Sequence, residues 1–261
     1  MSSAVRRRWI VAATAALLLT TAAACGADGS DDTSDTTTTS SPSPTSSEST
    51  TTTGGGGSDI TEEQLSGALL TVDDLPSGFA VSSDEDDDSD DDETDDLQAD
   101  DPGCQEALDA LDAATNDEAD EVTALATFDR NDVERVEYEL KAVPDAAERL
   151  ERVRSTLEED CKNRVEFTTD KASSGVLEVV DGAQHGDGTF YAKMRFTATE
   201  QDTEFEITAI VAYQANEGVG STISLVSADI PSMGVDGDEP TMADAEALSA
   251  KAQERYEDVF G

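Results

Sequence analysis

The stretch TFYAKMRFTATEQDTEFEITAIVAY, residues 189–213 of this 261-residue chain, decides the fold. Apolar and polar residues alternate in both of its halves. The apolar residues are Phe190, Ala192, Met194 and Phe196 in the first half and Phe205, Ile207, Ala209 and Val211 in the second. Because successive side chains of a strand point to opposite faces, this alternation is typical of two strands that share one buried face and one wet face.

The residues between the two halves predict how these strands pair. If Thr199–Asp202 makes the connection, Phe196 lies opposite Phe205, and Arg195 lies opposite Glu206. The apolar pair then lies on the buried face, and the charged pair lies on the wet face.

The rest of the chain from Ile60 predicts further strands and helices. More strands are expected in a hairpin that turns at Asp129–Asp132, and at Val165–Thr169, Val176–Val180 and Val219–Ile230. Helices are expected to begin at Thr61, Pro102, Asp145 and Thr241, where capping residues precede apolar residues at helical spacing. Residues 60–261 are therefore expected to form one α+β domain, a twisted antiparallel sheet with helices packed on one face.

Two cysteines lie on the apolar faces of expected helices. Cys104 begins the stripe that Leu108 and Leu111 continue, and Cys161 ends the stripe of the helix that starts near Asp145. Both side chains should point inward, so we expect a Cys104–Cys161 disulfide that contributes about 4 kcal/mol in the chain-entropy model. Two free buried thiols are the alternative, which an oxidising compartment disfavours.

The N-terminus has the layout of a secretory signal. Arg6-Arg7-Arg8 precede an apolar run, Trp9–Ala24, that is too short to be a typical membrane-spanning helix. The sequence Ala22-Ala23-Ala24-Cys25 resembles a bacterial lipobox, so we expect residues 1–24 to be a signal peptide and Cys25 to carry fatty acyl chains. This would place the protein at the cell membrane, lipid-anchored on the extracytoplasmic face. Cleavage by ordinary signal peptidase, which would release the protein, is the alternative.

Residues 25–59 are expected to tether the domain to this anchor. They are rich in Ser, Thr, Gly, Asp and Pro, and they lack the apolar residues needed to form a core. The tract Thr36–Thr53 could carry O-linked sugars or could be a plain solvated linker.

Strong acidity sets the partners that can be expected. The chain has 60 acidic and 16 basic residues and a net charge of −44, which disfavours nucleic acid and anionic lipid surfaces. Residues Asp84–Asp101 are expected to form a solvated acidic loop that interrupts the fold. A specific Ca²⁺ site and weak collective cation binding are alternatives, but this loop lacks the residue order of an EF-hand.

No motif points to catalysis, a metal or another cofactor. His185, the single histidine, lies among glycines and Asp187 that suit a tight connection between strands. There is no G-x-S-x-G, H-E-x-x-H or C-x-x-C pattern, so the protein is not expected to be an enzyme. Aromatic residues and Met194 could line a pocket or fill the core; the aromatic ones are Tyr138, Tyr191 and Tyr213.

The order of segments resembles a known family. The lipobox and Ser/Thr tether are followed by LLTVDDLPSGF at Leu69–Phe79, a helix that ends at Cys161, GDGTFYAKMRF at Gly186–Phe196 and a final helix. This order resembles actinobacterial sensor-domain lipoproteins, relatives of the extracytoplasmic sensor domain of mycobacterial receptor Ser/Thr kinases. The resemblance implies a helix-packed antiparallel sheet with a cleft and a ligand-binding role, without catalytic residues. The kinase domain has two disulfides, whereas this sequence can form one.

These observations predict a non-catalytic, membrane-tethered extracytoplasmic module that binds a small molecule, a lipid or a peptide in a cleft beside the sheet. The alternative is an envelope protein that contacts another protein, or has a structural role, without a small-molecule ligand. A structure without a sizeable apolar cavity would favour the alternative.

Overall fold

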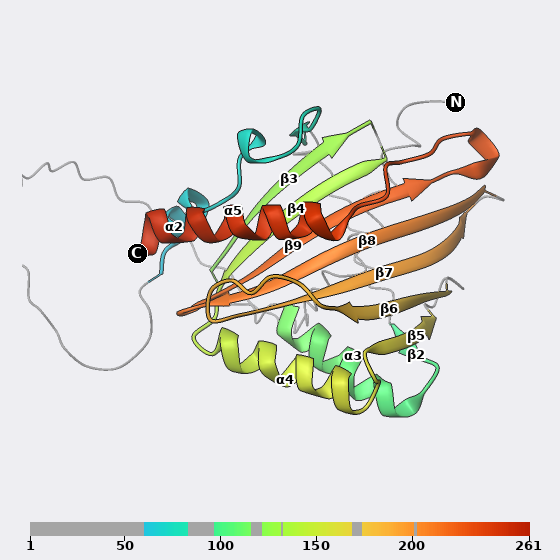
Figure 1. Cartoon of the computed structure of the whole chain (residues 1–261), viewed down its shortest axis with the longest axis horizontal. Helices are drawn as coiled ribbons and strands as arrows, with labels where there is room; N and C mark the ends of the chain where they lie inside the picture. Colours follow the sequence, from blue (N-terminus) through green and yellow to red (C-terminus); the bar gives the residue numbers. More distant parts are fainter. Residues whose placement is uncertain (1–59, 83–96, 116–121, 132, 169–173, 201–202) are drawn as a thin grey trace, which may run out of the picture. The chain divides into compact units, whose positions relative to one another are not determined.

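The protein is built around one wide antiparallel sheet (Figure 1). The computed structural model describes residues 60–82, 97–115, 122–131, 133–168, 174–200 and 203–261. The strands are β1 (Ala80–Val81), β2 (Gln98–Ala99), β3 (Thr123–Arg130), β4 (Glu134–Ala142), β5 (Arg164–Thr168), β6 (Ser174–Val180), β7 (Gly188–Glu200), β8 (Thr203–Asn216) and β9 (Val219–Asp229). They lie in the order β1-β3-β4-β9-β8-β7-β6-β5-β2. The α+β class and the antiparallel sheet expected from the sequence are confirmed.

The helices begin close to the residues that the sequence indicated. They are α2 (Glu62–Gly67), α3 (Pro102–Thr115), α4 (Ala146–Glu159) and α5 (Met242–Phe260), with 3₁₀ turns η1 (Val72–Asp74) and η2 (Pro231–Met233). At α2 the predicted capping box forms: the Gln64 amide donates to Thr61 Oγ1 at 3.3 Å, and the Thr61 amide donates to Gln64 Oε1 at 3.0 Å. Thr241 caps α5 by accepting the Asp244 amide at 3.2 Å.

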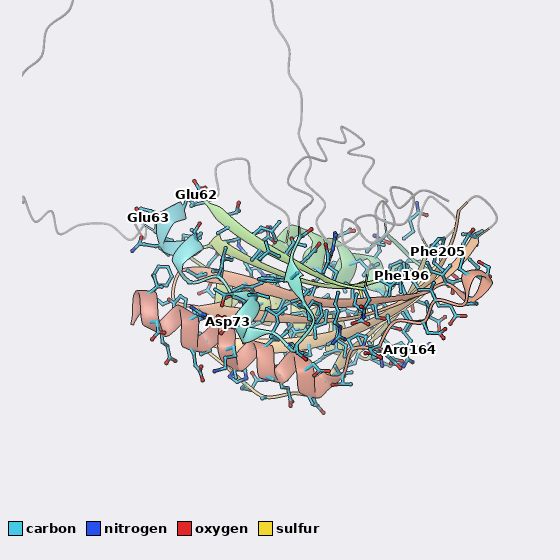
Figure 2. All side chains as sticks on the ribbon, turned by 90° about the horizontal axis from the view of Figure 1, so that it is seen from above. Glu62, Glu63, Asp73, Arg164, Phe196 and Phe205 are labelled. Atoms are coloured by element: carbon cyan, nitrogen blue, oxygen red, sulfur yellow. The ribbon has the colours of Figure 1, made fainter. Side chains whose placement is uncertain are left out.

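One face of the sheet packs against α3 and α4. Leu108 of α3 and Leu157 of α4 join a buried cluster with the apolar residues of β7 and β8 that the alternation identified. Their strand partners include Phe190, Ala192, Met194, Phe205, Ile207, Ala209 and Val211. The prediction of which side chains face the core is therefore confirmed. Figure 2 shows Phe196 and Phe205 on the side of the sheet opposite to α5.

The other face is also covered in part, which corrects the expectation of helices on one face. Leu248 and Ala252 of α5 form a second buried cluster with Tyr191, Ile210 and Ala212. The cause lies in the run from Ala209 to Ala212, which is apolar at every position and is buried on both faces. A strand that is buried on both faces does not alternate between apolar and polar residues. Helix α5 packs over the part of β8 where this alternation is absent.

The β7–β8 register differs from the expected one by two residues. Glu200 pairs with Thr203, so only two residues connect the strands instead of the four expected at Thr199–Asp202. As a result Phe196 lies opposite Ile207, and Arg195 lies opposite Thr208. A shift of two keeps every side chain on its face, so the assignment of the faces is unaffected.

The expected acidic loop is shorter than residues 84–101. Gln98 and Ala99 form β2 against β5, and Leu97 and Ala99 pack on the core, because these residues are apolar or neutral between charged neighbours. Residues 84–96 lie outside the described residues. The strands that precede and follow them, β1 and β2, lie at opposite edges of the sheet.

The expected signal peptide at residues 1–24, Cys25 and the tether to residue 59 also lie outside the described residues. Within the part of the chain that the structure describes, no helix has both the length and the apolar character needed to cross a membrane.

Candidate functional site

Helix α5 covers only one end of its face of the sheet, and the other end is an open polar surface. On β7 the side chains on this face change from buried Tyr191 to exposed Arg195 and Thr197. On β8 they change from buried Ile210 to exposed Glu206. The wet face expected from the sequence is therefore present beyond the end of α5.

This open surface forms a groove of about 630 Å³. Its floor is defined by the strand register, which aligns Arg195, Thr208 and Ser227 across β7, β8 and β9. The next row aligns Thr197 and Glu206 with Asp229. We call this surface the sheet groove; its other lining residues include Asp100, Glu166, Ser174 and Glu239.

The segment between η2 and α5 forms one wall of the sheet groove. The Gly237 amide donates to Asp229 Oδ1 at 2.8 Å, and the Asp238 amide donates to Glu134 Oε1 at 3.0 Å. A side chain at Gly237 would collide with Ser227 Oγ, so glycine allows this segment to lie directly against β9.

Glu239 fixes the same wall to the strands. Lys193 Nζ donates to Glu239 Oε1 at 2.7 Å, and Arg195 donates to the same oxygen at 3.0 Å. These hydrogen bonds and the two positive charges hold the pKa of the Glu239 carboxyl below its usual value. Lys193 and Arg195, the two cations that contact this wall, are thus already paired with a carboxylate of the chain itself.

The remaining charges make the sheet groove negative. Glu166 pairs with Arg164 at 3.1 Å. Asp100, Glu206 and Asp229 form no ion pair with any residue that the structure describes. A polar groove with this excess of carboxylates attracts positive charge and repels phosphate or carboxylate groups.

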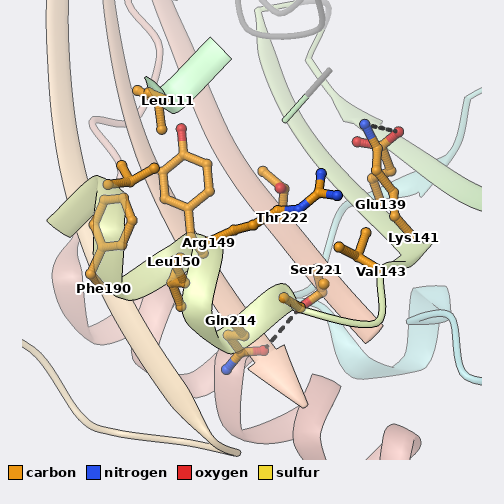
Figure 3. Close-up of a pocket in the computed structure, with 14 residues that line it drawn as sticks. Leu111, Glu139, Lys141, Val143, Arg149, Leu150, Phe190, Gln214, Ser221 and Thr222 are labelled. Carbon is orange, nitrogen blue, oxygen red and sulfur yellow. Dashed lines mark hydrogen bonds and ion pairs between the residues drawn. The ribbon is translucent and has the colours of Figure 1, made fainter. Parts of the chain in front are cut away.

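A second cavity lies on the opposite face, between α4 and strands β4, β8 and β9 (Figure 3). Phe190 and Tyr213 stack with ring centroids 4.6 Å apart and line it together with Leu150. Charged residues at this cavity already have partners: Arg149 pairs with Asp145 at 2.8 Å, and Lys141 pairs with Glu139 at 3.4 Å.

This second cavity is small, at about 40 Å³. Such a volume holds a few water molecules, whereas pockets for drug-sized ligands measure roughly 300–1,000 Å³. The Tyr213 hydroxyl is buried and has no hydrogen-bond partner among the described residues. Burial also raises the pKa of the Tyr213 phenol above its usual value. Because the apolar cavity is so small, the sheet groove is the stronger candidate site.

The structure brings Cys104 and Cys161 together. Both are free and buried, with 4% and 6% of their surface exposed. Burial and a hydrogen bond with Cys104 raise the pKa of the Cys161 thiol. The expected disulfide stays a prediction, and its two residues are neighbours at the start of α3 and just beyond the end of α4.

The tyrosines, Met194 and His185 that the sequence singled out lie outside the sheet groove. Tyr138, Tyr191 and Met194 are core residues, whereas Tyr213 lines the small cavity. His185 lies in the segment before β7, where its amide donates to Thr189 Oγ1 at 3.0 Å. No group of three or more potential ligand side chains that could hold a metal ion occurs among the described residues.

The sequence placed Arg195 and Glu206 on the wet face but did not predict that a groove forms there. Thr197, Glu206 and Thr208 belong to the polar half of the alternation, but their pattern does not reveal which part of that face a helix covers. The available signal was the loss of alternation at Ala209–Ala212, which marks where the cover by α5 begins.

No family model matches the chain, and no curated protein matches it. Two solved structures are similar to it at low identity. An uncharacterized protein from Mycobacterium smegmatis, an Rv0999 ortholog, is 15% identical with a TM-score of 0.40, covering 69% of this chain and 92% of that one. The extracellular domain of PknH from Mycobacterium tuberculosis is 12% identical with a TM-score of 0.43, covering 76% of this chain and 97% of that one. The second is the kind of domain that the sequence resembles.

Proposed function

We propose that this protein is a lipid-anchored, non-catalytic module of the extracytoplasmic cell envelope that binds a partner in the sheet groove. The observation that carries the proposal is the contrast between the two cavities. The open polar groove measures about 630 Å³, and the apolar cavity measures about 40 Å³. This contrast favours contact with another polypeptide over enclosure of an apolar small molecule.

The N-terminal sequence supports the location. The signal-like layout and the lipobox-like Ala22-Ala23-Ala24-Cys25 fit export followed by acylation of Cys25. Metabolic labelling with a fatty-acid analogue should mark the wild type and not the Cys25→Ser variant, and the variant should be released from the membrane. Labelling of both proteins, or of neither, would remove the lipid anchor from the proposal.

Site-specific crosslinking in cells tests the groove. A photoreactive amino acid at the position of Thr197, inside the sheet groove, should give a discrete adduct with an envelope protein. The same amino acid at the position of Asp258, exposed on α5, serves as the matched control and should not give this adduct. Adducts of equal yield at both positions, or no adduct at Thr197, would contradict the proposal.

A further inference from the structure

We infer that the occupant of the sheet groove is an extended, cationic polypeptide segment, an inference that rests on the proposed function and specifies its partner. Charge is the first argument. Five carboxylates line the groove, those of Asp100, Glu166, Glu206, Asp229 and Glu239, and Arg195 is the lining cation. Arg195 is already paired with Glu239, so the surplus charge that an incoming chain meets is negative.

The arrangement of the surplus carboxylates is the second argument. Asp100 follows β2 at one edge of the sheet, and its amide donates to the Glu166 carbonyl at 2.9 Å. Glu206 and Asp229 lie next to each other on β8 and β9. Negative groups therefore lie on both sides of the floor, and a chain that crosses the strands between them can place a cation near each side.

The floor between these carboxylates suits a polypeptide backbone. Thr197, Thr208, Ser227 and Ser174 are short hydroxyl side chains that can both donate and accept hydrogen bonds. The groove reaches from β5 to β9, which are four strand spacings apart and thus separated by roughly 19 Å. That distance corresponds to about five or six extended residues.

The same observations disfavour other occupants. Phosphate-bearing chains and anionic headgroups meet repulsion from the unpaired carboxylates. A single metal ion would need several ligands at one point, and the described residues contain no such group. An apolar ligand would have to cover hydroxyls and charges without pairing them.

Residue-resolved NMR of the mature chain with Cys25→Ser tests the inference. The probe is the hexapeptide Lys-Ser-Lys-Ser-Lys-Ser, and Glu-Ser-Glu-Ser-Glu-Ser is its anionic counterpart. The cationic peptide should shift the amide signals of Thr197, Thr208 and Ser227 in a saturable way. Its affinity should fall as salt is added, because the charged contacts are exposed to solvent.

Two double variants distinguish binding by the carboxylates of the groove from attraction to the net charge of the whole chain. Asp100→Asn with Glu206→Gln should weaken binding at the groove amides about threefold or more. Glu63→Gln with Asp258→Asn removes the same total charge from exposed positions elsewhere and should leave binding unchanged. Equal losses in the two variants would show attraction to overall charge and would overturn the inference.

The remaining outcomes distinguish the inference from the function on which it rests. If the groove amides respond to the anionic peptide instead, the cationic assignment is wrong while the groove remains a binding site. Spermine is the non-peptide control. If it shifts the groove amide signals with the same affinity as the cationic peptide, the polypeptide assignment is also overturned. If no probe shifts these amides and crosslinking at Thr197 gives no adduct, the proposed function fails as well.

Discussion

At the scale of single residues, the two buried cysteines give the most direct test of the chain's compartment. Cys104 and Cys161 are buried and in contact, and burial raises the pKa of the Cys161 thiol, which makes this thiol a poor nucleophile in the reduced protein. Their proximity allows a disulfide to join the start of α3 to the residue that follows the end of α4.

We therefore expect that the exported protein contains a Cys104–Cys161 disulfide. Cys104→Ser should lower the free energy of unfolding by as much as the Cys104→Ser/Cys161→Ser double variant, within about 1 kcal/mol, because either change removes the same bond. Denaturant unfolding measures both values. Two thiols that react with an alkylating reagent after denaturation of the exported wild type would refute the bond.

The Tyr213 hydroxyl provides a second test at this scale. It is buried without a hydrogen-bond partner among the described residues, whereas the Tyr191 hydroxyl donates to the Ala183 carbonyl at 3.0 Å. Removing an unpaired buried hydroxyl relieves a desolvation cost, and removing a paired one loses about 1 kcal/mol. Thermal unfolding should show Tyr213→Phe to be as stable as the wild type or more stable, and Tyr191→Phe to be less stable. A Tyr213→Phe variant with the larger loss would mean that this hydroxyl has a partner.

At the scale of elements, Arg255 of α5 connects the final helix to the 3₁₀ turn η1. It donates to Asp74 Oδ2 at 2.7 and 3.1 Å, and the same carboxylate accepts the Thr71 amide at 2.8 Å. Burial acts to raise the pKa of Asp74, but the hydrogen bonds from Thr71 and the contacts with Arg255 outweigh it and lower the pKa. The ionised form of Asp74 is thus the one that stabilises the fold.

This lowered pKa predicts a pH dependence. The contribution of Asp74 should be fully present above the unfolded-state pKa of about 3.9, and it should be lost as the pH falls through the lower folded-state value. Asp74→Asn should therefore be less stable than the wild type at pH 7 by about 1 kcal/mol, with the difference closing towards pH 2. Asp73→Asn, at the exposed neighbouring position, is the control. Urea unfolding at several pH values measures both, and a constant difference would disprove the role of ionisation.

The elements also show how far the sequence predicts this structure. Period-two alternation identified β7 and β8 and their core face, because burial on one side of a strand imposes that pattern. Which face α5 would cover could not be predicted in this way. That choice depends on contacts between residues far apart in the chain, such as Leu248 with the cluster around Ile210. The groove exists because α5 ends its cover there, and the loss of alternation at Ala209–Ala212 is the one local signal of that boundary.

At the scale of the whole molecule, strand order constrains the acidic segment between β1 and β2. These strands lie at opposite edges of the sheet, eight strand spacings apart, which amounts to roughly 38 Å. An extended chain advances at most about 3.6 Å per residue, so at least about 11 residues are needed to join the two edges. This segment therefore needs enough residues to join the two edges, so its length matters as well as its charge.

Two variants that lose the same charge distinguish the effect of the segment's length from the effect of its acidity. Replacing Asp84–Asp96 by 13 neutral Gly and Ser residues should keep both edge strands, because the connection can still reach across the sheet. Replacing the same residues by Gly-Ser should release β1 or β2. Hydrogen exchange measures this at two amides, Ser82 bonded to the Thr127 carbonyl and Asp100 bonded to the Glu166 carbonyl, each at 2.9 Å. The long variant should protect both amides and the short variant only one of them. Asp100 also borders the sheet groove, so a short variant that releases β2 should bind the cationic peptide more weakly. Protection of both amides in the short variant would contradict the strand order itself.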